Sequence, residues 1–302
     1  MSDRGSFDVI IIGGSYAGLS AAMSLGRSLR NVLVIDSGNP CNKQTPHSHN
    51  FITHDGETPA AIAAKARAQV QNYETVKFLS GFAINGRRVA DGFEVEMQTG
   101  EIFHAKKLLL ATGVTDIMPT ISGFKECWGI SVLHCPYCHG YEVKQQNIAV
   151  IANGDAGLEY AALIRNLTPR LTVLTNGPGL FSEEQVEKLK SHRIHIMEAE
   201  ISALEHTDGK VRSVLFKDNT QLEITALFAK PAFTQQSGIP QALGCTLTEH
   251  GHIDVDAMQQ TSVHGVYAAG DNTTMLRSVA AAVAAGNKAG AVINRELVQE
   301  SF

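Results

Sequence analysis

Residues 8–18 read DVIIIGGSYAG, a short apolar run that leads directly into a glycine-rich turn. The apolar run is typical of a parallel strand that is buried on both faces. A helix is predicted from Leu19 to about Leu29, and residues 32–36 (VLVID) predict a second strand that ends in a carboxylate, Asp36. A strand, a glycine turn, a helix and a strand ending in an acidic residue together predict a βαβ unit that binds a dinucleotide.

The residues of this turn have separate predicted roles. Gly13 permits the tight turn, and Gly18 lets the helix pack closely on the strand. The helix N-terminus offers backbone amides to a pyrophosphate, and Asp36 is placed to bond a ribose hydroxyl. Ser15 stands where the pattern has its middle glycine, and its hydroxyl could donate to the phosphate. A βαβ unit that binds no nucleotide is the structural alternative.

Residues 147–157 (NIAVIANGDAG) predict a second strand, turn and helix, but this turn departs from the pattern. Ala152 replaces the first glycine, and Asp155 places negative charge where a pyrophosphate would bind. The next predicted strand, 171–174, is followed by TNGPG, which has neither the carboxylate of an NAD site nor the arginines of an NADP site. The sequence therefore predicts the fold of a nicotinamide domain without its recognition residues.

The C-terminal part of the chain contains a further strand-and-turn pattern. Residues 261–271 (TSVHGVYAAGD) predict a strand that runs into a Gly-Asp turn, followed by a small-residue helix from about Arg277 to Leu297. Gly286 and Gly290 would let this helix approach its neighbour closely. Residues 108–113 (LLLATG) predict a similar strand and turn, which mark where the chain would leave the first segment of the domain.

The run HCPYCHGYE contains two cysteines, Cys135 and Cys138, at a spacing that allows a disulfide across one turn. Beside an electron carrier, such a pair can exchange two electrons with a thiol substrate. C-x-x-C-H is also the attachment pattern of c-type haem, but residues 1–5 lack the signal peptide of an exported protein. Zinc could use the flanking histidines, but no second Cys/His pair at finger spacing occurs, so no metal is predicted. A plain structural pair is the third alternative.

Composition narrows the class of protein. The chain has 302 residues, 44% of them hydrophobic, which is enough for a sizeable core. No apolar run is long enough to span a membrane, and a net charge of −5 without a basic stripe argues against nucleic acid as a partner. Five cysteines are an odd and modest number, unlike the dense even set of a small secreted scaffold, so a reducing cytoplasm is the expected location.

Taken together, GGSYAG with Asp36, the Ala111-Thr112-Gly113 turn, the central Cys-x-x-Cys and Ala269-Gly270-Asp271 resemble the low-molecular-weight thioredoxin reductase family. The resemblance covers nearly the whole chain and implies an α/β fold of two Rossmann-like, three-layer ββα domains, the second inserted in the first. It implies an FAD-binding domain formed by residues 1–115 and 232–302, and an NAD(P)-like domain formed by 116–231 that carries the cysteines. It also implies a homodimer whose domains rotate.

The same resemblance assigns a set of residues to FAD, all in or beside the quoted motifs. They are Gly13, Gly14, Ser15, Ala17, Gly18, Asp36, Ser37, Asn50, Ala111, Thr112, Gly113, Gly270, Asp271, Ser278 and Val279.

Within the family, the sequence is similar to a divergent branch, the gliotoxin- and holomycin-type dithiol oxidases. The similarity lies in DSG at 36–38, PHSHNF at 46–51, THDG at 53–56 and CHGYE at 138–142. Ordinary thioredoxin reductases have an aspartate after the second cysteine as general acid, whereas this chain has His139. The branch also commonly lacks intact pyridine-nucleotide motifs, so the resemblance implies an enzyme that is not driven by NADPH.

The implied mechanism uses three residues. By family analogy Cys138 faces the flavin, and Cys135 exchanges with the substrate sulfur. His139 can accept a proton near neutral pH, which suits the deprotonation of a dithiol; a helix-start histidine bonded to backbone is its structural alternative. The expected partner is a small dithiol or disulfide, or a thioredoxin-like protein. His47 and His49 lie in a polar loop that either contacts FAD or thiol or is a mobile surface loop.

Two other functions use the same motifs. One is an NADPH-dependent thioredoxin reductase with a divergent cofactor site. The other is a flavin-binding sensor without turnover, against which the intact cysteine pair argues.

Overall fold

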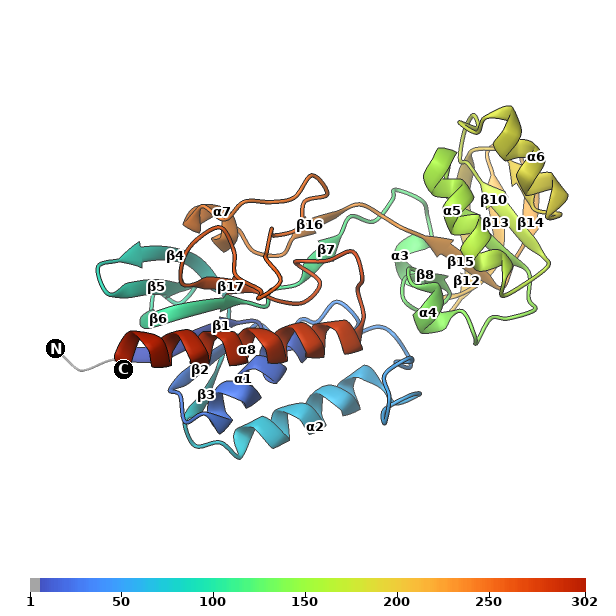
Figure 1. The fold of residues 1–302 in the computed structure, drawn as a ribbon. Coiled ribbons are helices and arrows are strands. Elements are labelled where there is room, and N and C mark those ends of the chain that lie inside the picture. The colour runs from blue at the N-terminus through green and yellow to red at the C-terminus, as the bar shows by residue number, and fades with distance from the viewer. Residues whose placement is uncertain (1–5) are drawn as a thin grey trace. The chain divides into compact units, whose positions relative to one another are not determined.

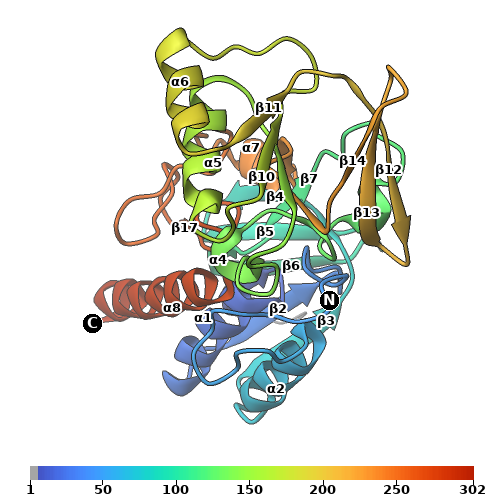
Figure 2. The same cartoon turned by 90° about the vertical axis from the view of Figure 1, so that its right-hand side faces the viewer.

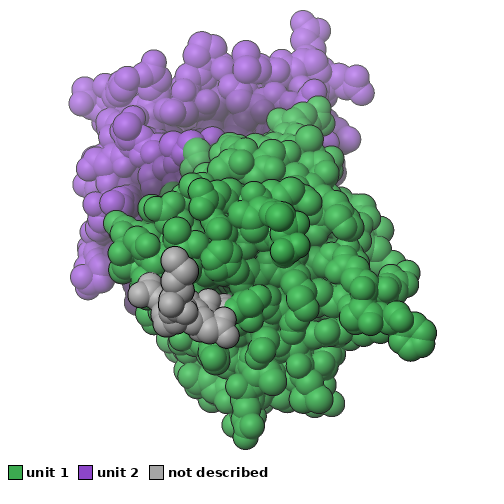
Figure 3. Space-filling model, turned by 90° about the vertical axis from the view of Figure 1, so that its left-hand side faces the viewer, with its two compact units in different colours: residues 1–43, 57–115, 233–302 green, residues 44–56, 116–232 purple. Residues whose placement is uncertain are grey.

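A computed structural model describes residues 6–302 of the chain; residues 1–5, on which the expected absence of a signal peptide rests, lie outside the described residues. The chain forms two compact units, coloured separately in Figure 3. Unit 1 comprises Met1–Lys43, Glu57–Thr115 and Phe233–Phe302, and unit 2 comprises Gln44–Gly56 and Asp116–Ala232. Gln44–Gly56, which the sequence-based division gives to the FAD-binding domain, therefore packs with unit 2.

Unit 1 is built on a seven-stranded sheet in which the order β3-β2-β1-β6-β5-β4 is extended by β17 on β6. The strands that pair in parallel are β1 (Ser6–Ile12), β2 (Val32–Asp36), β3 (Val76–Ser80), β6 (Ile102–Leu110) and β17 (Val266–Ala268). An antiparallel hairpin, β4 (Ala83–Val89) and β5 (Gly92–Met97), continues the sheet at β6. β1 is apolar from Val9 to Ile12 because both faces of this part are buried: Ile10 and Ile11 belong to two different buried clusters.

Three of the helices of unit 1 are α1 (Tyr16–Arg27), α2 (Pro59–Gln71) and α8 (Val279–Ser301). Figure 1 shows α8 alongside α1. The two helices approach closely because a Cβ at Gly286 would lie 2.0 Å from the carbonyl oxygen of Ala17, and one at Gly290 would lie 2.8 Å from that of Ala21. The predicted close packing of this helix is therefore confirmed.

Unit 2 contains a five-stranded parallel sheet in the order β11-β10-β9-β15-β8. Its strands are β8 (Val132–Leu133), β9 (Ile148–Ile151), β10 (Leu171–Leu174), β11 (His195–Met197) and β15 (Ala226–Ala229). The helices of the unit are α3 (Phe124–Cys127), α4 (Pro136–His139), α5 (Gly154–Arg165) and α6 (Glu183–Ser191). Figure 2 also shows the separate antiparallel sheet of unit 2, formed by β12 (Ile201–Thr207), β13 (Lys210–Phe216) and β14 (Gln221–Glu223).

The remaining elements are short. β7 (Val114–Asp116) and β16 (Phe233–Gln235) pair with each other in a two-stranded sheet, and α7 (Ile239–Leu243) follows β16. Among the described residues, 6–302, no helix is long and apolar enough to cross a membrane.

The predicted fold class is confirmed, whereas several element bounds differ. α1 begins at Tyr16, before the predicted Leu19, because the last three residues of the glycine motif, 16–18, already belong to the first helical turn. The strand predicted over 261–271 is limited to β17, since Gly265 turns the chain with a φ of +83°. α8 begins at Val279 rather than Arg277 because Ser278 caps it, accepting a hydrogen bond from the Ala281 backbone at 3.1 Å.

Candidate functional site

The first part of the site lies at the carboxyl ends of β1, β6 and β17. Ile12 and Leu110 are neighbours in the sheet, and the backbone N–H of Ala111 donates to the Ile12 carbonyl at 2.8 Å. Gly13 has a φ of +112°, and a Cβ there would lie 2.1 Å from the Ala111 carbonyl oxygen. A Cβ at Gly18 would lie 1.9 Å from the Gly13 carbonyl oxygen. Only glycine fits these two positions, so the chain turns tightly and α1 starts directly over the strand ends.

Asp36 ends β2 beside this turn. Its Oδ1 accepts the backbone N–H of Gly14 at 3.3 Å and that of Gly38 at 3.1 Å, and Arg67 of α2 lies 3.5 Å from Oδ2. These contacts fix the carboxylate next to the start of α1, the place expected for a ribose-binding acid. Arg67 could not be predicted as a partner of Asp36, because nothing local in the sequence pairs an arginine of α2 with the end of β2.

The start of α1 suits an anion. Ser15 is its N-cap residue but makes no side-chain capping hydrogen bond, and the first turn contains no acidic residue. A helix N-terminus with these properties carries partial positive charge and unused amides. Ala17 and Gly18 belong to the same first turns of the helix, and Ser37 directly follows Asp36.

Gly270 and Asp271 follow β17 in the same region. Gly270 has a φ of +102°, and a Cβ there would lie 3.1 Å from the Ala17 side chain. Asn272 is fully buried and donates from Nδ2 to the Leu110 carbonyl at 2.8 Å, while its Oδ1 has no hydrogen-bond partner. The sequence analysis did not single out Asn272, because an asparagine after a Gly-Asp turn is common in loops.

Asp271 has two further neighbours within unit 1. Arg277 lies 3.6 Å from its Oδ2, and the Cys41 thiol lies 3.6 Å from the same oxygen. Although part of Cys41 is exposed, desolvation of its sulfur and the Asp271 charge raise the pKa of the thiol to about 12. Cys41 therefore stays protonated at neutral pH and does not supply a thiolate. Ser278 and Val279, at the start of α8, complete the expected set on this unit.

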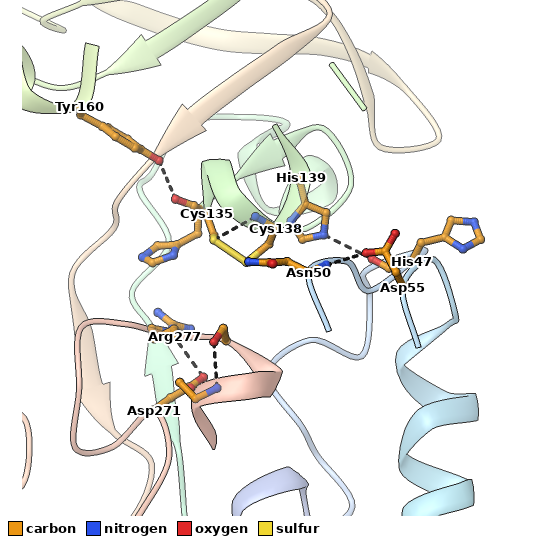
Figure 4. Close-up of a disulfide and its surroundings, with 12 residues drawn as sticks. His47, Asn50, Asp55, Cys135, Cys138, His139, Tyr160, Asp271 and Arg277 are labelled. Carbon is orange, nitrogen blue, oxygen red and sulfur yellow. Dashed lines mark hydrogen bonds and ion pairs between the residues drawn. A yellow bond between two sulfur atoms is a disulfide. The ribbon is translucent and has the colours of Figure 1, made fainter. Parts of the chain in front are cut away.

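The redox pair lies in unit 2. Cys135 and Cys138 form a disulfide with a Cα–Cα distance of 5.3 Å (Figure 4). Cys135 is the N-cap of α4, and its sulfur accepts the Cys138 backbone N–H at 3.2 Å. The segment that leads to it is held by the Tyr160 hydroxyl, which donates to the His134 carbonyl at 2.6 Å. Both cysteines are half-buried, and Tyr137 between them is exposed, so the disulfide is open to a substrate.

His139 follows the disulfide at the C-terminal end of α4. Its Nε2 lies 3.4 Å from the backbone carbonyl of His47, a contact drawn in Figure 4. A carbonyl can only accept, so this contact favours the tautomer with the hydrogen on Nε2 and leaves Nδ1 as the proton acceptor. Burial lowers the pKa of His139 below its usual value, and His49 lowers it further, while the His47 contact and Glu142 act in the opposite direction. The neutral form of His139, which can accept a proton at Nδ1, is therefore favoured at pH 7.

The loop of residues 44–56 contacts this histidine through His47 and His49. His47 Nδ1 lies 2.9 Å from the Gly56 carbonyl, and the Gly56 N–H donates to the Ser48 carbonyl at 2.9 Å, so hydrogen bonds close the loop on itself. Asn50 has a φ of +58° and donates its backbone N–H to Asp55 at 2.7 Å (Figure 4). Asn50 belongs to unit 2, whereas the other residues assigned to FAD belong to unit 1, and its contact with FAD stays a prediction.

His49 lies between two carboxylates. Its Nδ1 is 3.6 Å from Asp55 of its own loop, and its Nε2 is 3.6 Å from Glu142, which follows α4. Its ring lies edge-on to that of His139, with centroids 6.3 Å apart. The sequence analysis named His49 without partners, because nothing local in the sequence pairs its loop with α4.

The second dinucleotide-type turn, at the start of α5, is closed by its own side chains. Asn153 Oδ1 accepts the N–H groups of Gly154 at 2.9 Å and Leu180 at 2.7 Å, while its Nδ2 donates to the Pro178 carbonyl at 2.9 Å. These bonds tie the loop after β10 across the start of α5. Asp155 lies in the first turn and accepts from Gln185 at 2.6 Å.

Acidic groups continue around this turn. A Cβ on Gly179 would lie 2.6 Å from the Glu198 carboxylate, so this carboxylate lies against the loop. The first turn of α6 carries Glu183 and Glu184. An NADP site needs cations where this chain places carboxylates.

Comparison with known proteins agrees with this geometry. The family described as pyridine nucleotide-disulphide oxidoreductase matches residues 7–286. "Thioredoxin reductase tcpT" of Claviceps purpurea is 34% identical, with 99% of this chain and 97% of that protein covered. A crystal structure of an oxidoreductase from Agrobacterium tumefaciens has a TM-score of 0.92 and 36% identity over 98% of this chain and 99% of that one. The crystal structure of HlmI has a TM-score of 0.93 and 30% identity over 100% of this chain and 95% of that one.

Matches over nearly the full length join the glycine turn, the disulfide and the two-unit fold in one family. The chain belongs to the pyridine nucleotide-disulphide oxidoreductases and is a thioredoxin reductase-like, FAD-dependent disulfide oxidoreductase.

Proposed function

We propose that this enzyme is a dithiol oxidase that is not driven by NADPH. It removes two electrons and two protons from a dithiol through the Cys135–Cys138 disulfide and passes the electrons to FAD. The observation that carries this proposal is the closed start of α5, where Asn153 ties down the loop that would otherwise receive a pyrophosphate.

The two helix starts differ in the features that decide anion binding. The start of α1 has no side-chain cap and no acidic residue, whereas α5 has the Asn153 cap and Asp155. A negative charge near a helix N-terminus repels a phosphate and competes with it for the same amides. This contrast supports dinucleotide binding at α1 and argues against it at α5.

We propose that unit 1 is the FAD-binding domain and unit 2 the inserted domain. The pyrophosphate would lie at Gly13–Gly18 and the adenosine ribose at Asp36. The turns at Ala111–Gly113 and Gly270–Asp271, with Ser278 and Val279, would hold the flavin half. The buried, unpartnered Oδ1 of Asn272 fits this placement, since a hydroxyl of the cofactor could donate to it. When bound, the flavin supplies a two-electron acceptor for the reduced cysteine pair.

Asp36→Ala is expected to weaken FAD binding. The change removes a charge-assisted hydrogen bond to the ribose, worth about 1.5–3 kcal/mol, and the dissociation constant should rise by roughly 10- to 150-fold. Titration of apoprotein with FAD, followed by flavin fluorescence, measures this. Asp8→Ala is the matched control, because Asp8 also accepts a backbone N–H, from Asn31 at 3.0 Å, and pairs with a cation, Lys106. Equal affinity in the two variants would contradict the assignment of Asp36.

The exchange step follows from the residues around the disulfide. His139 takes the proton of one substrate thiol, and the thiolate attacks the Cys135 sulfur. The Cys135–Cys138 bond breaks, and its electron pair leaves on Cys138. The second substrate thiolate then attacks the substrate sulfur of the mixed disulfide and releases Cys135. The substrate leaves as a disulfide, two electrons and two protons poorer.

Dioxygen is the proposed terminal acceptor. One dithiol and one dioxygen molecule then give one disulfide and one hydrogen peroxide, which balances atoms and electrons. The second candidate is an NADPH-dependent thioredoxin reductase acting on a thioredoxin-like protein, and the name of the Claviceps purpurea relative favours it. We further propose a homodimer in a reducing cytoplasm, with a small dithiol as substrate.

Anaerobic titration of the bound flavin separates the two candidates. Dithiothreitol should bleach the visible flavin band, whereas NADPH and NADH should not do so at micromolar concentration. Each lost charge-assisted contact to the nucleotide is worth about 1.5–3 kcal/mol. The loss of a pair of them should therefore lower the affinity for NADPH by about two orders of magnitude or more. Rapid bleaching by micromolar NADPH would contradict the proposal and support the reductase.

A further inference from the structure

A second histidine lies within reach of the first. His49 belongs to the 44–56 loop, His139 to the end of α4, and their rings meet edge-on with centroids 6.3 Å apart. The loop and the helix are also joined by the contact between His139 Nε2 and the His47 carbonyl at 3.4 Å. His47 and His139, which are 92 positions apart in the chain, are thus brought together beside the redox disulfide.

The two rings differ in their surroundings. Burial lowers the pKa of His139, so this group readily gives up a proton once it has taken one. The His49 side chain is 21% exposed and lies 3.6 Å from each of two carboxylates, of which Asp55 is 68% exposed and Glu142 39% exposed. His49 therefore lies beside two carboxylates that are open to solvent.

We propose that His49, held by Asp55 and Glu142, is a positioning residue that receives the substrate proton from His139 and passes it to solvent. This inference rests on the proposed exchange chemistry. Oxidation of one dithiol releases two protons, but His139 has one free acceptor atom, Nδ1, when Nε2 carries its hydrogen. His139 must therefore lose the first proton before it can accept the second. Edge-on rings at this distance are within the reach of one bridging water.

All charged or titratable groups that the described contacts place against His49 belong to this arrangement. Asp55 and His47 come from its own loop, with the His47 ring 6.4 Å away, and Glu142 and His139 come from α4 and the turn after it. The two carboxylates face the two ring nitrogens of His49, one from each element, and the His139 ring lies edge-on to it.

His49→Gln tests the relay. With dithiothreitol as the probe, first-turnover formation of oxidised dithiothreitol should slow by roughly tenfold at pH 7, a smaller loss than removal of a general base itself causes. The rate should recover towards wild type above about pH 9, where the dithiol ionises unaided. Added imidazole should restore part of the rate at pH 7. Flavin content should stay unchanged.

Two further variants make the test specific. His54→Gln is the matched control, because His54 lies in the same loop but stacks on Phe51, away from His139. Glu142→Gln approaches the same ring from the other element and should reproduce the pH-dependent loss, even if His49→Gln does not fold. Identical pH profiles for His49→Gln, Glu142→Gln and His54→Gln would overturn the relay.

The readout keeps this proposal separate from the proposed function. Oxidised dithiothreitol reports exchange at the Cys135–Cys138 disulfide whichever compound reduces the flavin in the cell. Bleaching of the flavin by micromolar NADPH would therefore contradict the proposed dithiol oxidase function. The relay would still be tested by the pH profiles of the His49 and Glu142 variants.

Discussion

Cys138→Ser is expected to abolish dithiol turnover while FAD stays bound. A serine hydroxyl can neither form the disulfide nor leave as a thiolate, so the rate of dithiothreitol-driven oxygen consumption should fall by at least about three orders of magnitude. FAD should remain because the residues proposed to hold it, from Gly13 to Val279, all lie in unit 1 except Asn50. The flavin absorbance after gel filtration measures retention.

Cysteines elsewhere in the chain provide the control. Cys245 is buried, and its sulfur lies 3.6 Å from the Thr261 hydroxyl, so a serine can keep this contact. Cys245→Ser should therefore turn over at the wild-type rate. Turnover retained in Cys138→Ser, or lost equally in Cys245→Ser, would contradict the assignment of the redox pair.

His139→Gln should lower the rate of substrate oxidation by roughly 10²- to 10⁴-fold at pH 7, the usual contribution of a general base. Glutamine can still donate to the His47 carbonyl but cannot take a proton. In the wild type, burial lowers the pKa of His139 below 6.5, so the active neutral form persists down to pH values under 6.5 and is lost only with further acidification. The pH–rate profile of the variant should therefore lack the fall at acidic pH that protonation of His139 causes in the wild type. Its rate should instead rise with pH until the substrate thiol is ionised.

The matching control uses the histidine on the other side of the cysteines. The His134 ring lies edge-on to Trp128 at 6.5 Å, and its backbone carbonyl binds Tyr160. His134→Gln should change the rate by less than about threefold at any pH from 6 to 9, the range of an ordinary surface change. If the rate in His134→Gln fell as much as in His139→Gln, the assignment of His139 as the general base would be contradicted.

The sequence predicts the first dinucleotide turn well because its determinants are local. A Cβ at Gly13 would meet the Ala111 carbonyl, which directly follows the adjacent strand, and one at Gly18 would meet the Gly13 carbonyl. The short apolar run before the glycine turn is typical of a strand that is buried on both faces. The same holds for the cysteine spacing, since four consecutive residues determine whether a disulfide can close across one turn.

The surroundings of these motifs could not be predicted in the same way. Ala152 and Asp155 indicated a damaged turn, but the closure by Asn153 depends on where the loop at Leu180 folds back. The pairing of His49 with Glu142 depends on the packing of two segments that are distant in the sequence. Side-chain contacts of this kind arise from tertiary structure and leave no periodic or compositional trace in the chain.

The grouping of residues 44–56 with unit 2 has a consequence for recombination. A chimera that exchanges only 116–232 with a relative would separate His139 from the carbonyl of His47 and from the His49 ring. The chimera would combine the disulfide of one parent with the 44–56 loop of the other. The exchangeable module of this enzyme is therefore discontinuous, and crossover points chosen at the sequence borders of the inserted domain divide it.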